Sequence, residues 1–474
     1  MKFIFSVGFI LVMLTFLAKN VCAATCQLSD QEGFIVVSDI HLNGNKTTKD
    51  YIIYRELLFE EGDTILLKNY EHVFLQSARN LNNTGLFNFV FIDTLGVKTG
   101  TRVDIHLVER WYIWPVPHLE IAERNFNTWW KGKNLSKINY GLALTNNNFR
   151  GRREYLEFFF QRGFEESYNM GYNMPYINRN QTLGAGAALG YSRNKGVPYR
   201  VRNNKLEYFI LPDYYIKEQF SATLHLRYRK DIHQTHNLWV SYINLNYADT
   251  IVQKNNMFSQ YGMQSNKFFK INYIYRDDHR DAKAYPLSGY FFDFEIMKYG
   301  LGILKNEALN TMFVKLRYRR FLPLKNKFYF ALSNNVKWSN YSYQPFFIKT
   351  GLGYDNNYVR GYEYYVVEGI SYWHLKTNLK YEILEPRTQI IDFISSEKFN
   401  MIHYALYINL FLDAGYTYDF RNSRHLSNDL TETLLLGYGV GVDFVTYYDK
   451  VVRFEYSLNK MKESGFFINF VAPI

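Results

Sequence analysis

From about Trp111 onward, the chain consists of successive segments of roughly ten residues in which apolar and polar side chains alternate. Asn, Gly, Asp, Lys and Pro, the residues typical of turns, separate these segments. Successive side chains of a strand point to opposite faces, so each segment predicts a strand with one apolar and one polar face. A barrel with lipid outside and water inside requires this pattern in strand after strand, because backbone groups that face lipid need partners within the protein.

The last four segments show the alternation most clearly. In the first of them, a leucine-rich face is opposed by Asn409, Phe411 and Asp413. A soluble sandwich would turn a polar face outward. The predicted apolar faces are Leu406, Ile408, Leu410, Leu412 and Ala414; Leu436, Tyr438, Val440, Val442 and Phe444; Val452, Phe454, Tyr456 and Leu458; and Phe466, Ile468 and Phe470.

The pattern predicts an all-β transmembrane barrel for residues 112–474. At about 22 residues per strand and connection, this length accommodates about 16 antiparallel strands, an even number as in bacterial single-chain barrels. We expect the first strand near residues 137–146 and the last near residues 465–472, with the seam of the barrel between them.

The composition agrees with a membrane barrel and argues against other classes. Aromatic residues make up 19%, with 42 Tyr and 39 Phe, as interfacial girdles require. The net charge is +11, but the basic residues are dispersed, which argues against nucleic-acid binding. We find no nucleophile, metal-ligand or phosphate-loop motif, and therefore expect no enzyme activity, metal or cofactor.

Residues 1–23 have the features of a secretory signal peptide. Lys2 is followed by a nearly apolar run from Phe3 to Leu17 and by the small residues of Val21-Cys22-Ala23. The apolar run is too short for a membrane helix, which needs about 20 residues. A lipoprotein site at Cys26 fits less well, because Ala23-Ala24-Thr25 lacks the expected aliphatic residue. Cleavage of the signal peptide after Ala23 or Ala24 would leave one cysteine and hence no disulfide framework.

Residues 33–111 form a separate β-α-α-β-β pattern. Phe34, Val36, Ile40 and Leu42 share one face of the first predicted strand. Thr47 and Asp50 predict the start of a helix that ends at Gly62. The remaining elements are a helix over Lys68–Leu81 and strands over Phe87–Asp93 and Arg102–Glu109.

Short motifs in this region resemble a polypeptide-transport-associated (POTRA) domain. They are I-x-L-x-G-N-x-x-T from Ile40, R-E-L from Arg55, E-G-D from Glu61 and G-L-F from Gly85. The resemblance implies a periplasmic domain that receives extended clients or partners by strand addition at a sheet edge. Only one such unit is found.

Two further motifs resemble the BamA/TamA/Sam superfamily of outer-membrane assembly barrels, here of the bacterial surface antigen type. Val359-Arg360-Gly361-Tyr362 has the form of its V-R-G-[FY] turn, and Phe411, Asp413 and Gly415 have the form of its F-x-D-x-G strand. The resemblance implies that a loop folds into the lumen and that Arg360 meets Asp413 there, with Glu455 as a further acceptor. It also implies that Val359 and Tyr362 pack the loop tip.

Other segments extend this resemblance over nearly the whole mature chain. Gly361 suits a position with positive φ, and Gly437, Gly439 and Gly441 are expected to make room for the loop. By resemblance, residues 148–151 are the first external turn. The chain departs from the family at its end, where Val471-Ala472-Pro473-Ile474 replaces the usual final aromatic residue.

These features predict a protein of a Gram-negative outer membrane that assists insertion or translocation of client proteins. Its expected partners are the lipid bilayer, unfolded client outer-membrane proteins and accessory lipoproteins. Two alternatives stay open: a passive channel, and a scaffold barrel that anchors a partner lipoprotein. A scaffold would offer residues 421–433 and 341–347 as docking places.

Overall fold

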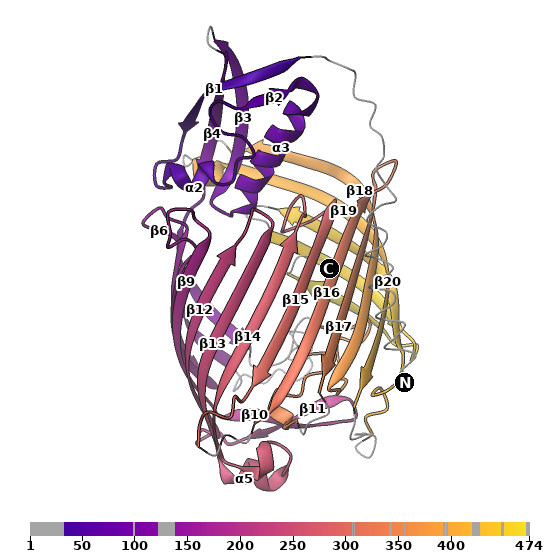
Figure 1. Ribbon diagram of the computed structural model, residues 1–474. Coiled ribbons are helices and arrows are strands. Elements are labelled where there is room, and N and C mark those ends of the chain that lie inside the picture. Colours follow the sequence, from indigo (N-terminus) through magenta and orange to yellow (C-terminus); the bar gives the residue numbers. More distant parts are fainter. Residues whose placement is uncertain are drawn as a thin grey trace.

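The structure is a computed structural model that describes residues 33–97, 100–121, 138–305, 307, 309–340, 344–354, 357–391, 394, 397–419, 427–446 and 450–470. The predicted signal peptide and the last four residues lie outside these ranges. Figure 1 shows an amino-terminal domain, drawn in indigo, at one end of a large curved sheet and helix α5 (Asp249–Lys254) at the opposite end.

The amino-terminal domain has a four-stranded sheet in the order β2-β1-β4-β3, with β2 and β3 as its free edges. Its second helix and its last two strands lie where the sequence predicts them, but the three-residue strand β2 is not predicted. The elements are β1 (Phe34–Asn43), α2 (Asp50–Tyr54), β2 (Thr64–Leu66), α3 (Leu67–Asn83), β3 (Phe87–Val97) and β4 (Gly100–Glu109).

Two local predictions in this domain are wrong for identifiable reasons. Helix α2 ends at Tyr54 and not at Gly62, and its N-cap residue is Lys49, which makes no side-chain capping bond. Thr47 and Thr48 lie before the helix, where their backbone amides donate to Glu109 at 3.1 and 2.7 Å. Strand β1 contains a register shift after Val37, so that Val37 and Ile40 both face the core. A strict two-residue period cannot anticipate such a bulge.

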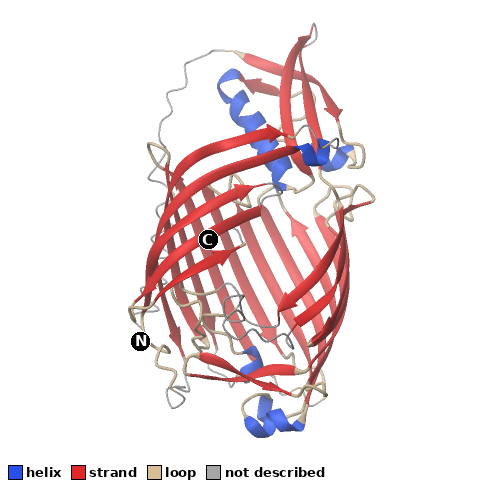
Figure 2. Ribbon diagram, turned by 180° about the vertical axis from the view of Figure 1, so that it is seen from behind, coloured by secondary structure: helices blue, strands red, loops and turns tan. Residues whose placement is uncertain are grey.

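The large sheet contains 16 strands, each antiparallel to its neighbours, in the order β5-β6-β7-β8-β9-β12 and then consecutively to β22. The predicted strand number and all-β class are therefore confirmed. Figure 2 shows that strands form the wall of the barrel and that the longest helix lies in the amino-terminal domain. Short helices also occur in connections between barrel strands, among them α6 (Glu397–Asn400) between β18 and β19. No helix of the described residues is long and apolar enough to cross a membrane. The strands are β5 (Ile113–Ile121), β6 (Ile138–Phe149), β7 (Glu154–Gly163), β8 (Glu165–Met174), β9 (Leu183–Asn194), β12 (Lys217–Arg229), β13 (Gln234–Tyr247), β14 (Ser265–Asp278), β15 (Gly289–Tyr299), β16 (Thr311–Pro323), β17 (Phe328–Ser339), β18 (Ser371–Ile390), β19 (Met401–Tyr418), β20 (Leu435–Thr446), β21 (Lys450–Asn459) and β22 (Ser464–Asn469).

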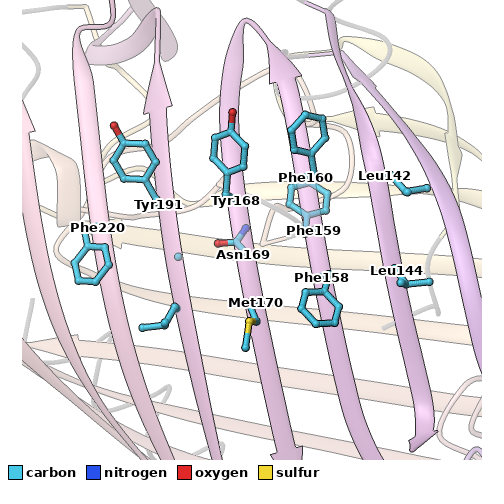
Figure 3. Close-up of a pocket in the computed structure, with 12 residues that line it drawn as sticks. Leu142, Leu144, Phe158, Phe159, Phe160, Tyr168, Asn169, Met170, Tyr191 and Phe220 are labelled. Carbon is cyan, nitrogen blue, oxygen red and sulfur yellow. The ribbon is translucent and has the colours of Figure 1, made fainter.

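The predicted apolar faces point outward. In β19, Leu410 and Leu412 are 54% and 55% exposed, whereas the intervening Phe411 and the following Asp413 are buried. Figure 3 shows the same arrangement on β6–β9 and β12, where side chains such as Phe158 and Met170 line a hollow of about 520 Å³ on the outer face. An uncharged exterior around a polar interior is what a bilayer requires.

The seam of the sheet lies between β5 and β22, which do not pair with each other in the described residues. The predicted first strand near residues 137–146 is wrong, because those residues largely belong to β6, the second strand. Pro115 and Pro117 obscured β5 in the sequence, since proline inside a run argues against a strand. Proline is tolerated here because β5 is an edge strand that pairs only with β6.

Connections at the two ends of the barrel differ. Most turns beside the amino-terminal domain are short, whereas the far end carries α5 (Asp249–Lys254), η3 (Gln260–Gly262), η4 (Phe346–Ile348) and the hairpin β10 (Gly196–Arg202)–β11 (Lys205–Ile210). The residues 148–151, expected as an external turn, lie instead against the amino-terminal domain. There Lys49 N donates to Gly151 O at 3.0 Å, and a Cβ on Gly151 would meet Thr47 O at 2.0 Å.

Candidate functional site in the barrel lumen

The connection between β17 and β18 folds back into the barrel, and we call its residues 344–354 and 357–370 the inner loop. Leu352 and Val367 pair across it, and its tip carries Val359 and Tyr362, which are 1% and 2% exposed. Both side chains pack in a cluster with Leu435 of β20. This packing holds the loop against the inner face of the carboxy-terminal strands.

Arg360, at the tip of the inner loop, is surrounded by acceptors. Its Nε and Nη2 donate to the two carboxylate oxygens of Asp413 at 2.8 and 2.7 Å, and its Nη1 donates to Glu455 at 3.1 Å. Asn378 accepts a further bond from Nη1 at 2.8 Å. The guanidinium carbon lies 3.8 Å from the ring centroid of Phe411, a cation–π arrangement. The structure thus brings Arg360 together with three side chains named from the sequence, those of Phe411, Asp413 and Glu455.

Glycines allow the loop to approach the wall. Gly361 has a φ of 91°, which favours glycine, and a Cβ on Gly437 would lie 1.7 Å from Arg360 O. A Cβ on Gly415 would lie 2.6 Å from Val359 Cγ2. Of the three glycines expected to make room for the loop, Gly437 does so. The other two accommodate wall side chains, Gly439 beside Phe411 and Gly441 beside Asn409.

A second ion pair adjoins the first and was not predicted. Arg453 donates to Asp443 at 2.5 and 2.8 Å and to Glu455 at 3.4 Å, so that Glu455 bridges two arginines. Asn469 of β22 donates to the other oxygen of Glu455 at 2.9 Å. Asp443 and Arg453 are direct cross-strand partners on predicted polar faces, and that complementarity of charge was the available signal.

We refer to Arg360, Asp413, Glu455, Arg453 and Asp443 as the lumen network. All five side chains are nine-tenths or more buried. A charge in such a place requires its partner, because removing one member of a buried pair costs about 3–5 kcal/mol. Chemically, the network offers strong ion pairing and hydrogen bonding between the inner loop and three adjacent strands. Among the described residues, no group of three or more His, Cys, Asp or Glu side chains could hold a metal.

Another buried ion cluster joins the amino-terminal domain to the barrel. The carboxylate of Glu56 accepts bonds from both terminal nitrogens of Arg229 in β12, at 2.5 and 2.8 Å, and from Arg153 at 3.3 Å. Tyr176 accepts from Arg229 at 2.6 Å. Burial acts to raise the pKa of Glu56, but the hydrogen bond and charge of Arg229, with Arg153, lower it to about 2. We call these four residues the docking cluster.

Comparison with known proteins identifies the amino-terminal domain. The family model described as "POTRA: Surface antigen variable number repeat" matches residues 35–110. The chain therefore combines a POTRA domain with a 16-stranded β-barrel, the architecture that the motifs predicted for an outer-membrane barrel of the BamA/TamA/Sam type.

Solved structures of two kinds are similar in fold. BamA from Haemophilus ducreyi lacking POTRA domains 1–3 is 16% identical, with 92% of this chain and 83% of that chain covered and a TM-score of 0.49. CdiB from Acinetobacter baumannii is 13% identical, with 92% and 74% covered and a TM-score of 0.45. CdiB from Escherichia coli is 9% identical, with 95% and 92% covered and a TM-score of 0.48. No curated protein matches the sequence.

Proposed function

We propose that the protein inserts client proteins into the outer membrane or translocates them across it, with the POTRA domain in the periplasm. An extended client segment would first add to a free edge of the POTRA sheet, β2 or β3, by backbone hydrogen bonds. It would then pair at the seam between β5 and β22. This order keeps unpaired backbone groups away from lipid throughout.

The observation that carries the proposal is the open seam. A sheet edge with free N–H and C=O groups is a template for another strand. The nitrogens of Pro115 and Pro117 point to the same edge of β5, because alternate residues of a strand do, and neither nitrogen can donate a hydrogen bond. Prolines are found where that edge has no partner. Their position therefore supports a seam that closes weakly and can admit a client.

Depletion of the protein tests this function directly. We expect a defined set of outer-membrane barrels or surface proteins to fall in the outer-membrane proteome, and a strain carrying Arg360→Ala to lose the same set. The measurement is quantitative proteomics of purified outer membranes. An unchanged proteome with altered solute uptake would favour a passive channel instead. An effect limited to one associated lipoprotein would favour a scaffold.

Restoring the missing donors at the seam should slow the protein. In the double variant Pro115→Val and Pro117→Val, β5 regains two N–H groups at its free edge, and each added bond to β22 would contribute about 1 kcal/mol to closure. We expect slower insertion of a client barrel into proteoliposomes that contain the variant. Pro198→Val, in the hairpin β10–β11 at the far end, is the matched control. An insertion rate equal to that of the control would count against a weak seam.

A further inference from the structure

We infer that Tyr285 is a positioning residue that links the placement of the POTRA domain to the lumen network and, through that network, to β22. Tyr285 lies in the connection 279–288 between β14 and β15, which we call the domain turn. The inference builds on the proposed function, in which POTRA domain and seam act in sequence. It concerns contacts within this chain alone, so that it can be tested without a client.

One face of the domain turn is bound to the POTRA domain through Asn83, the last residue of α3. The side-chain Nδ2 of Asn83 donates to Asp281 O at 3.1 Å, and the side-chain Oδ1 of Asn83 accepts from Lys283 N at 3.1 Å. The ammonium of Lys283 donates in turn to the backbone carbonyl of Asn83 at 3.1 Å. A single POTRA residue is therefore joined to the turn by three hydrogen bonds.

Tyr285 itself, two residues beyond Lys283, is directed into the barrel and is 6% exposed. Its hydroxyl donates to Oδ2 of Asp443 at 2.8 Å, and its ring packs against Tyr407, with centroids 4.8 Å apart. The ammonium of Lys380 lies 4.0 Å from the centre of the Tyr285 ring. The side chain is thus fixed on three sides by residues of the lumen wall.

Asp443 passes the contact on to the far side of the network. Asp443 accepts from Nε and Nη2 of Arg453, and Nη1 of Arg453 donates to Glu455. Glu455 then contacts Arg360 of the inner loop and Asn469 of β22. The backbone of the domain turn from Lys283 to Tyr285, together with these hydrogen bonds, therefore connects α3 of the POTRA domain with the strand that forms one side of the seam.

The domain turn is built to move as one piece. Asp281 braces it by accepting from Ala282 N and Leu287 N at 2.9 and 3.1 Å. Pro286 restricts the backbone of Tyr285, which precedes it. Gly289 closes the turn at a φ of 95°, with His279 O 2.0 Å from the position of a Cβ. A displacement at Asn83 is therefore expected to reach Tyr285 rather than to be absorbed between them.

The test is amide hydrogen exchange in β21 and β22, measured on the full mature chain in lipid nanodiscs without client. Tyr285→Phe removes one hydroxyl and keeps the ring, while Asn83→Ala removes the two side-chain bonds between the POTRA domain and the domain turn and keeps the bond from Lys283 to the backbone carbonyl. We expect either substitution to speed exchange in β22 by about threefold or more, and the double variant to add little to either. Tyr329→Phe is the matched control. Tyr329 packs in the same cluster as Tyr285, but its hydroxyl donates to Glu382, which is not one of the residues that link Asn83 to β22.

Two results would overturn the inference. In one, Asn83→Ala changes exchange only in the POTRA domain and the domain turn, which breaks the connection even if Tyr285→Phe destabilises the barrel. In the other, the effects of the two substitutions on β22 add fully, which means that they act independently. If Asn83→Ala leaves exchange in β22 unchanged while client insertion is normal, the role of Tyr285 is rejected and the proposed function stands. If exchange in β22 responds as expected but depletion of the protein affects no client, the proposed function is rejected and the role of Tyr285 stands.

Discussion

Replacing Arg360 by alanine should lower the stability of the folded barrel more than most single substitutions. The change leaves the carboxylate of Asp413, which is fully buried, without its bidentate partner and removes one of two arginines from Glu455. Stranding a buried charge in this way costs about 3–5 kcal/mol. We expect a lower urea concentration at the midpoint of unfolding in detergent micelles. The measurement is the difference in electrophoretic mobility between the folded and the unfolded barrel.

The physical origin of the loss can be separated with two further variants. Arg360→Lys keeps the charge but cannot form the planar two-bond contact, so it should recover only part of the stability. Arg360→Ala combined with Asp413→Ala should be less destabilised than the sum of the single variants, since no carboxylate of Asp413 is then stranded. Arg317→Ala, which breaks a more exposed pair with Asp293 on β15–β16, serves as control. An equal loss in Arg317→Ala and Arg360→Ala would contradict a special role for the lumen network.

Replacing Glu56 by glutamine should release the POTRA domain from the barrel. The variant keeps the size of the side chain but leaves Arg229, 5% exposed, and Arg153 without their carboxylate. Electron–electron distance measurements between spin labels on α3 and on the domain turn should then show a broad distribution in place of a narrow one. Glu61→Gln is the control, because this POTRA glutamate accepts a hydrogen bond from the backbone of Ile40, within its own domain. A narrow distribution in Glu56→Gln would mean that other contacts suffice for docking.

The same contact should make docking sensitive to acid. The pKa of Glu56 is about 2 in the docked state, below its ordinary value of 4.5. The carboxylate therefore contributes its full stabilisation, about 3 kcal/mol, above pH 4.5. This contribution is lost as the pH falls from about 4.5 towards 2. The narrow distance distribution of the unaltered protein should broaden over that interval, and the distribution of Glu56→Gln should not change with it.

The parts of the structure that could be predicted are those with a periodic or charged signature. The outward face of β19 and the meeting of Arg360 with Asp413 followed from alternation and from a recognised motif. Strand β5 was missed because Pro115 and Pro117 are unfavourable in a paired strand and acceptable only at an edge, which is a property of the tertiary fold. The turn at residues 148–151 was assigned to the wrong end, because a turn sequence does not encode the side of the membrane on which it lies.

The ion pairs that were missed share one cause. Glu56 and Arg229 are far apart in the sequence and belong to different domains, so no spacing rule connects them. Asp443 and Arg453 were each placed correctly on a polar face, but their pairing depends on the register between β20 and β21. Register is set by the turn and by neighbouring strands together. Local sequence is therefore informative about faces and less so about partners.

At the far end of the barrel, three connections hold one another. Asn204, at the tip of β10–β11, accepts a bond from Val366 of the inner loop and one from Leu430 of the β19–β20 connection. Asn428 contacts the hairpin and the inner loop in the same way. Mechanically, these bonds restrain the ends of the strands at one rim of the barrel. Relative motion of the strands is then concentrated at the opposite rim, so that widening would take the form of a wedge that opens from the end beside the amino-terminal domain.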